Sequence, residues 1–319
     1  MSKQNEIPEV DIVIDEEKGV IREVKPQNFR SKKGHERRVN TTIYIILILM
    51  SIIWLAPFVF LVFQSFRSYA LESGGMVDYL LPKTWSLDNY RWLFDTNNSY
   101  FLKWYGNTLI IAIFCAIIQT IMVLSVSYAL SRLRFKGRKL IMNICLVLGL
   151  FPGFLTMITL YFLLKQLGLT QSGAIPGLIL IYTASSGMGY YISKGFFDTI
   201  PKSLDESARI DGATRFQVFL KIIMPLAKPI IIYTILMAFM APWGDYVFAS
   251  YVAFGSEPNY NVAVGLYRWV NVADYQGYFT RFCAGGVLVA VPITILFMCL
   301  QKYYVEGVTG GAEIGRAHV

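Results

Sequence analysis

The chain has 319 residues, of which 55% are hydrophobic and only 16% are charged. Soluble domains usually carry about 25% charged residues, so this composition excludes an ordinary soluble protein. The net charge of +8 follows from 29 Lys and Arg against 21 Asp and Glu. These cations gather on one side of the predicted topology, so nucleic-acid binding is not needed to explain them.

Six long apolar stretches account for the missing charge. A helix rises about 1.5 Å per residue and the hydrocarbon core is about 30 Å thick, so about 20 apolar residues cross it. The stretches are Val39–Phe66, Trp104–Ser131, Leu140–Leu164, Gln166–Ser193, Pro229–Ser256 and Phe282–Gln301. We predict an all-α, polytopic membrane protein with six transmembrane helices, over residues 41–65, 106–130, 140–164, 173–193, 229–255 and 281–302. The alternative, buried helices of a large soluble core, would need six such runs in one chain.

The positions of Lys and Arg predict the orientation. The tail of residues 1–40 holds nine of them, the link after the second span five, residues 194–228 six and the C-terminal tail two, whereas the other side keeps seven. Because positive residues stay in the cytoplasm, both termini are expected inside. The first 40 residues are too polar for a cleavable signal peptide.

Apart from these spans, the cysteines and one loop stand out. Cys115, Cys145, Cys283 and Cys299 lie in or beside apolar runs without metal-ligand spacing, so we interpret them as small apolar residues and expect no metal site. The loop of residues 64–106 is rich in aromatics, which favour the membrane–water interface or a partner surface.

The segment of residues 200–224, between the fourth and fifth spans, is patterned as a helical elbow. Ser203 with Glu206 and Thr214 with Gln217 each have the spacing of a capping box, and Gly212 suits a helix end. One apolar face is predicted for the second helix, formed by Phe216, Phe219, Leu220 and Ile223. Pro225 then marks the entry to the fifth span. An elbow with this pattern is more than a linker.

This elbow resembles the signature loop of permease subunits of bacterial binding-protein-dependent importers of the ATP-binding-cassette class. The family pattern is Glu-Ala-Ala, three residues, Gly, nine residues, Ile, any residue, Leu-Pro. In the sugar-importer branch this pattern is often extended as Asp-Gly-Ala. The chain matches the pattern and its extension at Glu206, Ala208, Asp211, Gly212, Ala213, Ile222 and Pro225. Ser207 replaces the first Ala and Met224 the Leu.

The resemblance implies that the elbow is a coupling helix, which sits in a cleft of an ATPase subunit and carries its closure to the spans. On this basis the ATPase-coupling residues are Glu206, Ser207, Ala208, Asp211, Gly212, Ala213, Ile222 and Pro225. Local roles stay open for three of them. Glu206 is also a capping residue, Gly212 is needed either to end a helix or for close approach of the ATPase, and Asp211 has Arg215 four residues on as an ion-pair partner.

The resemblance covers nearly the whole chain after the tail. Further segments look like MalG-type subunits of the maltose/maltodextrin branch, with galacto-oligosaccharide permeases as near relatives: Ser127–Arg138, Lys194–Pro201, Ala241–Ala249, Val262–Leu266 and Lys302–Gly311. The family's tail implies ATPase contacts at Glu306, Gly307, Thr309 and Gly310. We thus assign residues 41–311 to the importer domain. Residues 312–319 depart from the pattern, and Ile314–Val319 resembles translated sequencing adapter.

Asp245 is the one ionisable residue deep within a predicted span, which makes it a functional candidate. With Trp243 and Tyr246 it would line a sugar path, because aromatic faces and carboxylates suit sugar rings and hydroxyls. The alternative is a hydrated position near the end of the span. In the maltose-type family the paired permease is thought to hold most sugar contacts, which disfavours the lining role.

The resemblance implies a complex of a second homologous permease, two ATPase subunits and an external solute-binding protein, in the bacterial cytoplasmic membrane. This chain lacks a Gly-x-x-x-x-Gly-Lys-Ser/Thr phosphate loop, so we expect no catalytic residue here and place ATP and Mg on the partners. The predicted cargo is an oligosaccharide, with maltodextrin ahead of other sugars. An ion-coupled transporter would need more ionisable groups within the membrane than this chain has. An intramembrane enzyme is also disfavoured, because the two histidines of the chain lie in its termini.

Overall fold

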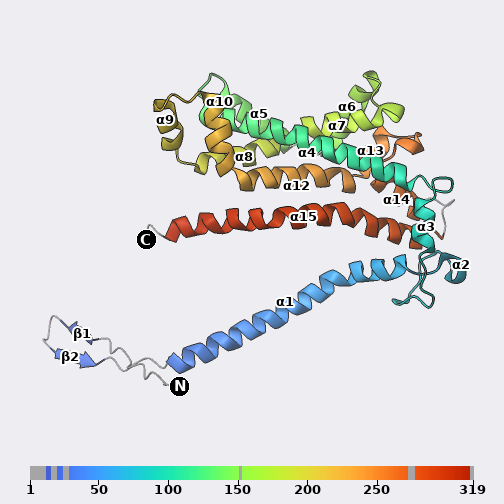
Figure 1. Ribbon diagram of the computed structural model, residues 1–319, viewed down its shortest axis with the longest axis horizontal. Coiled ribbons are helices and arrows are strands. Elements are labelled where there is room, and N and C mark those ends of the chain that lie inside the picture. The colour runs from blue at the N-terminus through green and yellow to red at the C-terminus, as the bar shows by residue number, and fades with distance from the viewer. Residues whose placement is uncertain (1–11, 16–19, 24–28, 151–152, 272–276, 317–319) are drawn as a thin grey trace. The chain divides into compact units, whose positions relative to one another are not determined.

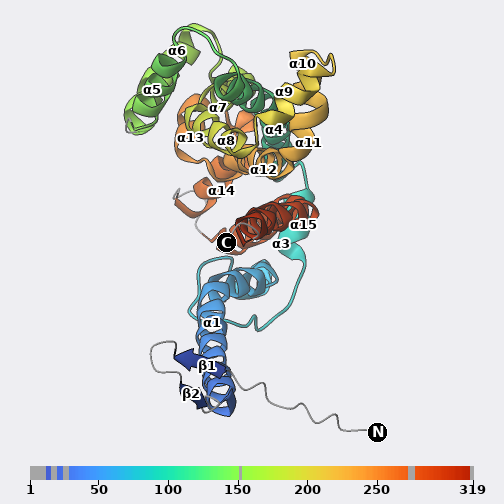
Figure 2. The ribbon, with the colours of Figure 1, turned by 90° about the vertical axis from the view of Figure 1, so that its left-hand side faces the viewer.

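The computed structural model describes residues 12–15, 20–23, 29–150, 153–271 and 277–316. The fold is helical, as predicted, with one short hairpin added (Figures 1 and 2). Its elements are β1 Ile12–Asp15, β2 Val20–Glu23, α1 Phe29–Ser65, α2 Tyr69–Glu72, α3 Asp88–Phe94, α4 Phe101–Arg132, α5 Arg138–Gly149, α6 Gly153–Gln166, α7 Ala174–Ala184, α8 Gly187–Thr199, α9 Ser203–Ile210, α10 Arg215–Val218, α11 Met224–Leu226, α12 Lys228–Gly244, α13 Val247–Val252, α14 Val262–Asn271 and α15 Phe279–Arg316. Three further turns are a π-helix at Phe219–Ile223 and 3₁₀ turns at Gln171–Gly173 and Glu257–Asn259.

The chain divides into two units, of which the first is Met1–Val59. Here β1 and β2 form an antiparallel pair in which Ile12 lies opposite Glu23. The sequence did not predict these strands. The rest of the unit is most of α1, and every residue of it from 37 to 59 is exposed. An apolar helix exposed on all sides has to be covered by lipid or by other protein.

Three described helices are long and apolar enough to cross a membrane: Arg37–Ser65, Phe101–Arg132 and Phe279–Lys302. Two pairs pass the same test together but are bent at a break, Leu155–Gln166 with Gln171–Thr199 by 103° and Arg215–Leu226 with Lys228–Gly244 by 82°. By length and composition, the described part of the chain therefore holds three candidate spans, or up to five when each bent pair is one span. The count of six stays a prediction.

Polar side chains bond to the backbone at two further breaks, one between α7 and α8 and one after α12. Between α7 and α8 the Ser186 hydroxyl donates to the Thr183 carbonyl at 2.8 Å, in place of a backbone amide. After α12, which has Pro242 inside it, the Asn261 amide donates to the carbonyls of Pro242 at 3.0 Å and Asp245 at 2.7 Å. The predicted fifth span therefore ends as a helix at Gly244, and α13 begins anew.

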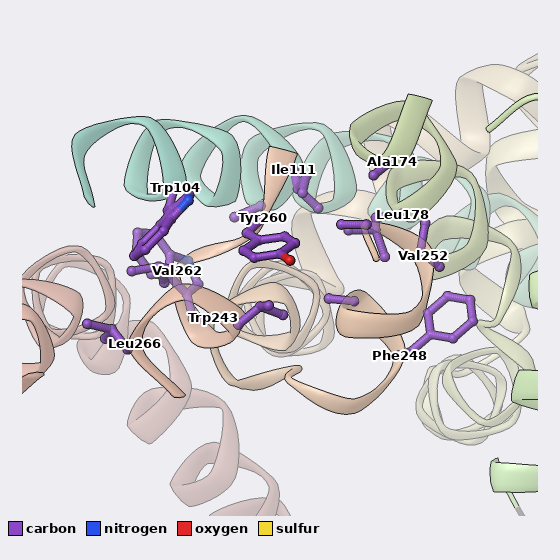
Figure 3. Packing of buried hydrophobic residues seen from close by; sticks show 14 of the residues in the cluster. Trp104, Ile111, Ala174, Leu178, Trp243, Phe248, Val252, Tyr260, Val262 and Leu266 are labelled. Carbon is purple, nitrogen blue, oxygen red and sulfur yellow. The ribbon is translucent and has the colours of Figure 1, made fainter. Parts of the chain in front are cut away.

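The larger core of the second unit forms around α4, which packs along α12, α8 and α7. Figure 3 shows part of this cluster, including Trp104 and Ile111 of α4 with Leu178 of α7 and Trp243 of α12. Buried aromatics contribute most to such a core because each removes a large apolar area from water.

Three side chains near the start of α4 hold the segment that follows α13. Trp104 donates from its indole nitrogen to the Glu257 carbonyl at 2.8 Å, and Asn107 donates to the carbonyls of Pro258 and Tyr260, both at 2.9 Å. The Thr108 hydroxyl accepts from the Val262 amide at 2.8 Å. Because buried backbone groups need partners, these bonds let an irregular segment lie against a membrane helix.

Residues 66–100 form, with Trp269, Tyr278 and Arg281, a compact layer that we call the aromatic cap. The Arg281 guanidinium lies 3.8 Å from the centre of the Tyr69 ring and 3.9 Å from that of Trp92. Arg67 is fully buried and donates to the Gly75 carbonyl. Asn89 donates to the Arg67 carbonyl at 2.8 Å and accepts from the Thr280 hydroxyl at 3.0 Å. The aromatic-rich loop is thus a folded layer.

Candidate functional site

The predicted elbow consists of α9 and α10, joined by a tight turn. Its start differs from the prediction, because the N-cap of α9 is Lys202 in helical conformation and no side chain caps it. Ser203 is the first helical residue, and its carbonyl accepts the hydroxyl of Ser207. The capping box of Ser203 and Glu206 was therefore wrong. Its spacing is right, but the helix begins one residue too early for Ser203 to act as the cap.

The end of α9 is set by Gly212, as predicted. Gly212 has a φ of +89°, a region that favours glycine. Its amide donates to the Arg209 carbonyl at 3.2 Å, and the Ala213 amide donates to the Ala208 carbonyl at 2.9 Å. These two bonds form the Schellman motif that closes many helices. A Cβ built on Gly212 meets nothing within 4 Å, so the chain itself requires this glycine for its φ alone.

The second helix begins with the predicted capping box. The Thr214 hydroxyl accepts from the Gln217 amide at 3.3 Å, and the Gln217 side chain accepts from the Thr214 amide at 2.8 Å. Two unsatisfied amides are paired in this way, which fixes the direction of α10. The turn between the two helices is thus determined from both sides by local sequence.

The apolar face predicted for the second helix is wrong in part. Ile223 is buried and Phe219 half-buried, but Phe216 and Leu220 are exposed, whereas Val218 is buried. The reason is the π-helix at Phe219–Ile223, which has one extra residue per turn and shifts the face that points inward. Two apolar side chains are left outside, and Ile210 at the end of α9 joins them.

A second, smaller core lies where the elbow meets α4. Tyr128 of α4 packs on Phe219, with 4.7 Å between ring centres, and on Phe197, with 6.2 Å. Ala208 and Ala213 of the elbow pack against the same cluster. The elbow therefore rests on the last turns of α4 as well as on its own covalent neighbours.

Arg132, the last residue of α4, holds the elbow by polar contacts. Its Nε lies 3.1 Å from Oδ2 of Asp205 in α9, and its Nη2 donates to the Ile200 carbonyl at 2.7 Å. The neighbouring Ser131 donates to Asp198 at 2.6 Å, and Asp198 also pairs with Lys194. Burial raises the pKa of the Asp205 carboxyl, although the Arg132 charge acts to lower it. This junction fixes the elbow to α4.

The predicted coupling residues divide into two groups. Ala208, Ala213 and Ile222 are half-buried, and the first two help to seat the elbow. The others are exposed on its surface: Glu206, Ser207, Asp211, Gly212 and Pro225. Asp211 and Arg215 form no ion pair in the described part of the chain, so that local alternative is not found. Glu306, Gly307, Thr309 and Gly310 lie in α15, but their side chains are outside the described residues.

The three candidates for a sugar path lie at the end of α12. Trp243 is buried against Tyr105, with 5.2 Å between ring centres. Asp245 is half-buried and accepts hydrogen bonds from the Tyr182 hydroxyl and, at 3.0 Å, from the Phe248 amide. It thus caps α13. Tyr246 packs against Tyr267, with 3.8 Å between ring centres and the ring planes tilted by 31°. Their predicted role in a sugar path stays a prediction.

Several residues with clear structural roles were not singled out from the sequence. Arg132 was counted only as one cation of a basic link, and Tyr182 and Asn261 were not considered. Their partners lie far along the chain, so no local spacing pairs them. For Tyr182 and Asn261 the one signal is polarity beside an apolar run, which marks many side chains in this chain.

The comparison with protein families identifies the class. Residues 121–310 match the family of binding-protein-dependent transport system inner membrane components. The chain belongs to this family, which covers the elbow, its seat on α4 and the last membrane helix. The family description confirms the predicted membrane location.

Similar curated proteins include permeases that are named for carbohydrates. The chain is 35% identical over 275 residues to the galactooligosaccharides transport system permease protein GanQ of Bacillus subtilis, covering 85% of this chain and 94% of that protein. It is 34% identical over 278 residues to the maltodextrin transport system permease protein MdxG of the same organism, covering 85% and 95%. Among solved structures, a chain of a bacterial ABC transporter that imports alginate aligns with a TM-score of 0.70 and 24% identity, over 88% of this chain and all of that one. This last likeness concerns the fold.

Proposed function

We propose that this chain is a permease subunit of an ATP-binding-cassette importer that carries oligosaccharides across the bacterial cytoplasmic membrane. The observation that carries the coupling role is the elbow, which is tightly capped yet presents apolar side chains outward. Ile210 is 86% exposed and Phe216 is 68% exposed. Exposed apolar groups on a rigid support are typical of a protein interface.

In this proposal, α9 and α10 sit in a cleft of an ATPase subunit. Closure of two ATPases around ATP and Mg then pulls the elbow and, through Tyr128 and Arg132, the inner end of α4. The exposed coupling residues, Glu206, Ser207, Asp211, Gly212 and Pro225, would contact the ATPase. Ala208, Ala213 and Ile222 would keep the elbow seated. No residue of this chain would be catalytic.

The rest of the complex follows from the family. A second homologous permease completes the pore, and an external solute-binding protein delivers the sugar. We assign six spans with both termini in the cytoplasm, because the basic link and the elbow then lie on the same side. The importer domain is residues 41–311, and Glu306 to Gly310 would reach the ATPases.

For the cargo we propose maltodextrins, with galacto-oligosaccharides as the alternative, since the relatives MdxG and GanQ are similar to this chain to almost the same degree. Uptake of labelled maltodextrins and galacto-oligosaccharides by cells that carry the complete importer would distinguish them. Uptake that persists without the ATPase and collapses with the proton gradient would instead indicate an ion-coupled transporter.

Two glycines allow a matched test of the coupling role. Gly212 and Gly137 have similar φ values of +89° and +92°, both lie in connections on the predicted cytoplasmic side, and neither has an atom within 4 Å of a built Cβ. Gly212→Trp and Gly137→Trp therefore impose similar backbone strain, and the Cβ of neither variant clashes with the chain. We expect Gly212→Trp to insert normally but to lose ATPase binding and sugar uptake, and Gly137→Trp to keep both. Normal uptake with Gly212→Trp would refute the coupling role.

A further inference from the structure

A basic cavity lies between the end of α4, the link to α5 and the elbow. Its volume is about 350 Å³, and Tyr128 and Val218 lie among its lining. Six cations line it: Arg132, Arg134, Arg138, Lys202, Arg209 and Arg215. The proposed coupling role does not account for this gathering, because the exposed apolar side chains of the elbow are not part of the cavity and Glu206 is the one coupling residue in its lining.

The charges of the residues that line this cavity do not balance one another. Only two carboxylates line it, Asp205 and Glu206, and Asp205 is already paired with Arg132. Like charges that converge on one concavity repel each other and attract an anion. The surplus is therefore four positive charges around a space large enough for a phosphate group.

A buried donor in the lining also lacks a partner. The Arg132 side chain is only 3% exposed, and its Nη1 makes no hydrogen bond. Arginine presents several donors in a planar fork that matches phosphate oxygens. Its Nη2 donates to the Ile200 carbonyl, and its Nε pairs with Asp205 by charge without a hydrogen bond, so the edge that carries Nη1 is left unpaired.

A second hollow of about 370 Å³ adjoins the first, because Arg134 and Arg138 line both. Its other lining includes Phe135 and Leu140, which are exposed apolar side chains. Leu140 begins the outward apolar surface of α5, a helix with no buried residue in the described chain. Apolar surface directly beside the cations favours a ligand with a hydrocarbon chain over a soluble anion.

We propose that the basic cavity binds the phosphate of an anionic phospholipid from the inner leaflet, with an acyl chain along Phe135, Leu140 and α5. Basic pockets beside transmembrane helices on the cytoplasmic side are known to take such headgroups. The phosphate lies between α4 and the elbow, so the lipid bridges the two elements that Arg132 also joins. The site requires the membrane location but not the coupling role.

The test uses the full chain purified in mild detergent, with phosphatidylglycerol as the probe and retained lipid counted by native mass spectrometry. We expect one tightly held phosphatidylglycerol in the wild-type chain and about five-fold weaker retention for each of Arg134→Gln and Arg138→Gln. The matched control is Lys136→Gln, since Lys136 is exposed in the same link but lines neither hollow. Equal retention in the arginine variants and the control would overturn the proposal.

Two further experiments distinguish a bound phospholipid from a free phosphate ion. Inorganic phosphate up to millimolar concentration should not displace the lipid, and phosphatidylcholine should not replace it. Displacement by inorganic phosphate would mean a free-anion site and overturn the lipid assignment. When the ATPase subunits are added, retention should persist; loss of lipid on assembly would mean that an acidic group of the ATPase occupies the cavity. Retention is measured without transport, so failure here leaves the coupling role to be judged by Gly212→Trp.

Discussion

The elbow and the aromatic cap are both irregular segments between membrane helices, but they are stabilised in opposite ways. The cap buries its side chains on each other, with Arg281 enclosed by Tyr69 and Trp92 and Arg67 fully buried. The elbow is ordered mainly by capping bonds within its own backbone and is held to α4 by few contacts, while Ile210 and Phe216 face outward.

This difference suggests how the two segments are used. A layer held by many mutual contacts moves as one body with the helices it covers. An elbow that is locally rigid but attached at few points can transmit a force while its contact with the rest of the chain changes. Variants that weaken each segment should therefore differ in how far their effects spread.

The largest effect is expected for Arg132→Met, which leaves the half-buried Asp205 carboxylate without its cation. Breaking one side of a buried ion pair costs about 3 to 5 kcal/mol, and because the Asp205 side chain is 16% exposed we expect the lower end of that range. Hydrogen exchange of residues 203–218 should accelerate accordingly, whereas the cap should be unaffected. Asp205→Asn added to Arg132→Met should recover part of the loss, and Lys136→Met serves as the control. Unchanged exchange in Arg132→Met would mean that the junction does not hold the elbow.

Arg281→Gln is expected to destabilise the cap by about 2 kcal/mol, because a desolvated cation between two aromatic faces is lost. Arg281→Lys should restore part of this, since an ammonium keeps the charge but not the planar stacking. Tryptophan fluorescence during thermal unfolding would report the change through Trp92. The control is Arg91→Gln, because Arg91 is exposed. An equal shift of the unfolding temperature in this control would contradict the role given to Arg281.

Gly212→Ala should cost about 1 kcal/mol through its φ of +89° alone. Gly195 lies inside α8 with equally open surroundings, so Gly195→Ala should instead stabilise its helix by up to about 1 kcal/mol. Hydrogen exchange of α9 and α8 would measure both. If both variants change helix stability in the same direction, the left-handed conformation is not the reason that Gly212 is needed.

The smallest effect is expected from Glu72 in the cap. Burial acts to raise its pKa, but hydrogen bonds from Thr84, Tyr79 and Lys83 outweigh burial and lower the pKa to about 2. Because the folded pKa lies below the ordinary value of 4.5, the stabilisation is present above pH 4.5 and is lost as the pH falls towards 2. The rate of amide hydrogen exchange in residues 69–84 should therefore rise as the pH falls from 4.5 towards 2, after correction for the intrinsic pH dependence of exchange. Glu72→Gln should abolish it and Asp78→Asn should not.

The features predicted well are those that local sequence determines. Long apolar runs predicted α1, α4 and α15, and residue type predicted the turn at Gly212 and the capping box of Thr214. Each of these depends on neighbours within a few residues, so one sequence contains the necessary information.

The features that were missed depend on distant partners or on a change of helical period. Nothing near Arg132 indicates Asp205 as its partner, and nothing near Asn261 indicates the carbonyls at the end of α12. The face of α10 was predicted from a period of 3.6, which fails where the π-helix begins. Ser203 shows the limit of spacing rules, since a correct pattern with a helix start shifted by one residue gives no cap.

The π-helix has a consequence for how this region tolerates change. The signature pattern places nine residues between Gly212 and Ile222, and the wide turn at Phe219–Ile223 lies within that interval. Deleting one residue there would either replace the wide turn with an ordinary α-helical turn or, where the wide turn is kept, rotate the elbow by about 100° relative to α12, since one residue is one step of a 3.6-residue turn. Substitutions at Leu220 or Lys221 leave that angle intact. The length of this interval is therefore a stricter requirement than its composition, and insertions or deletions should be far rarer here than replacements.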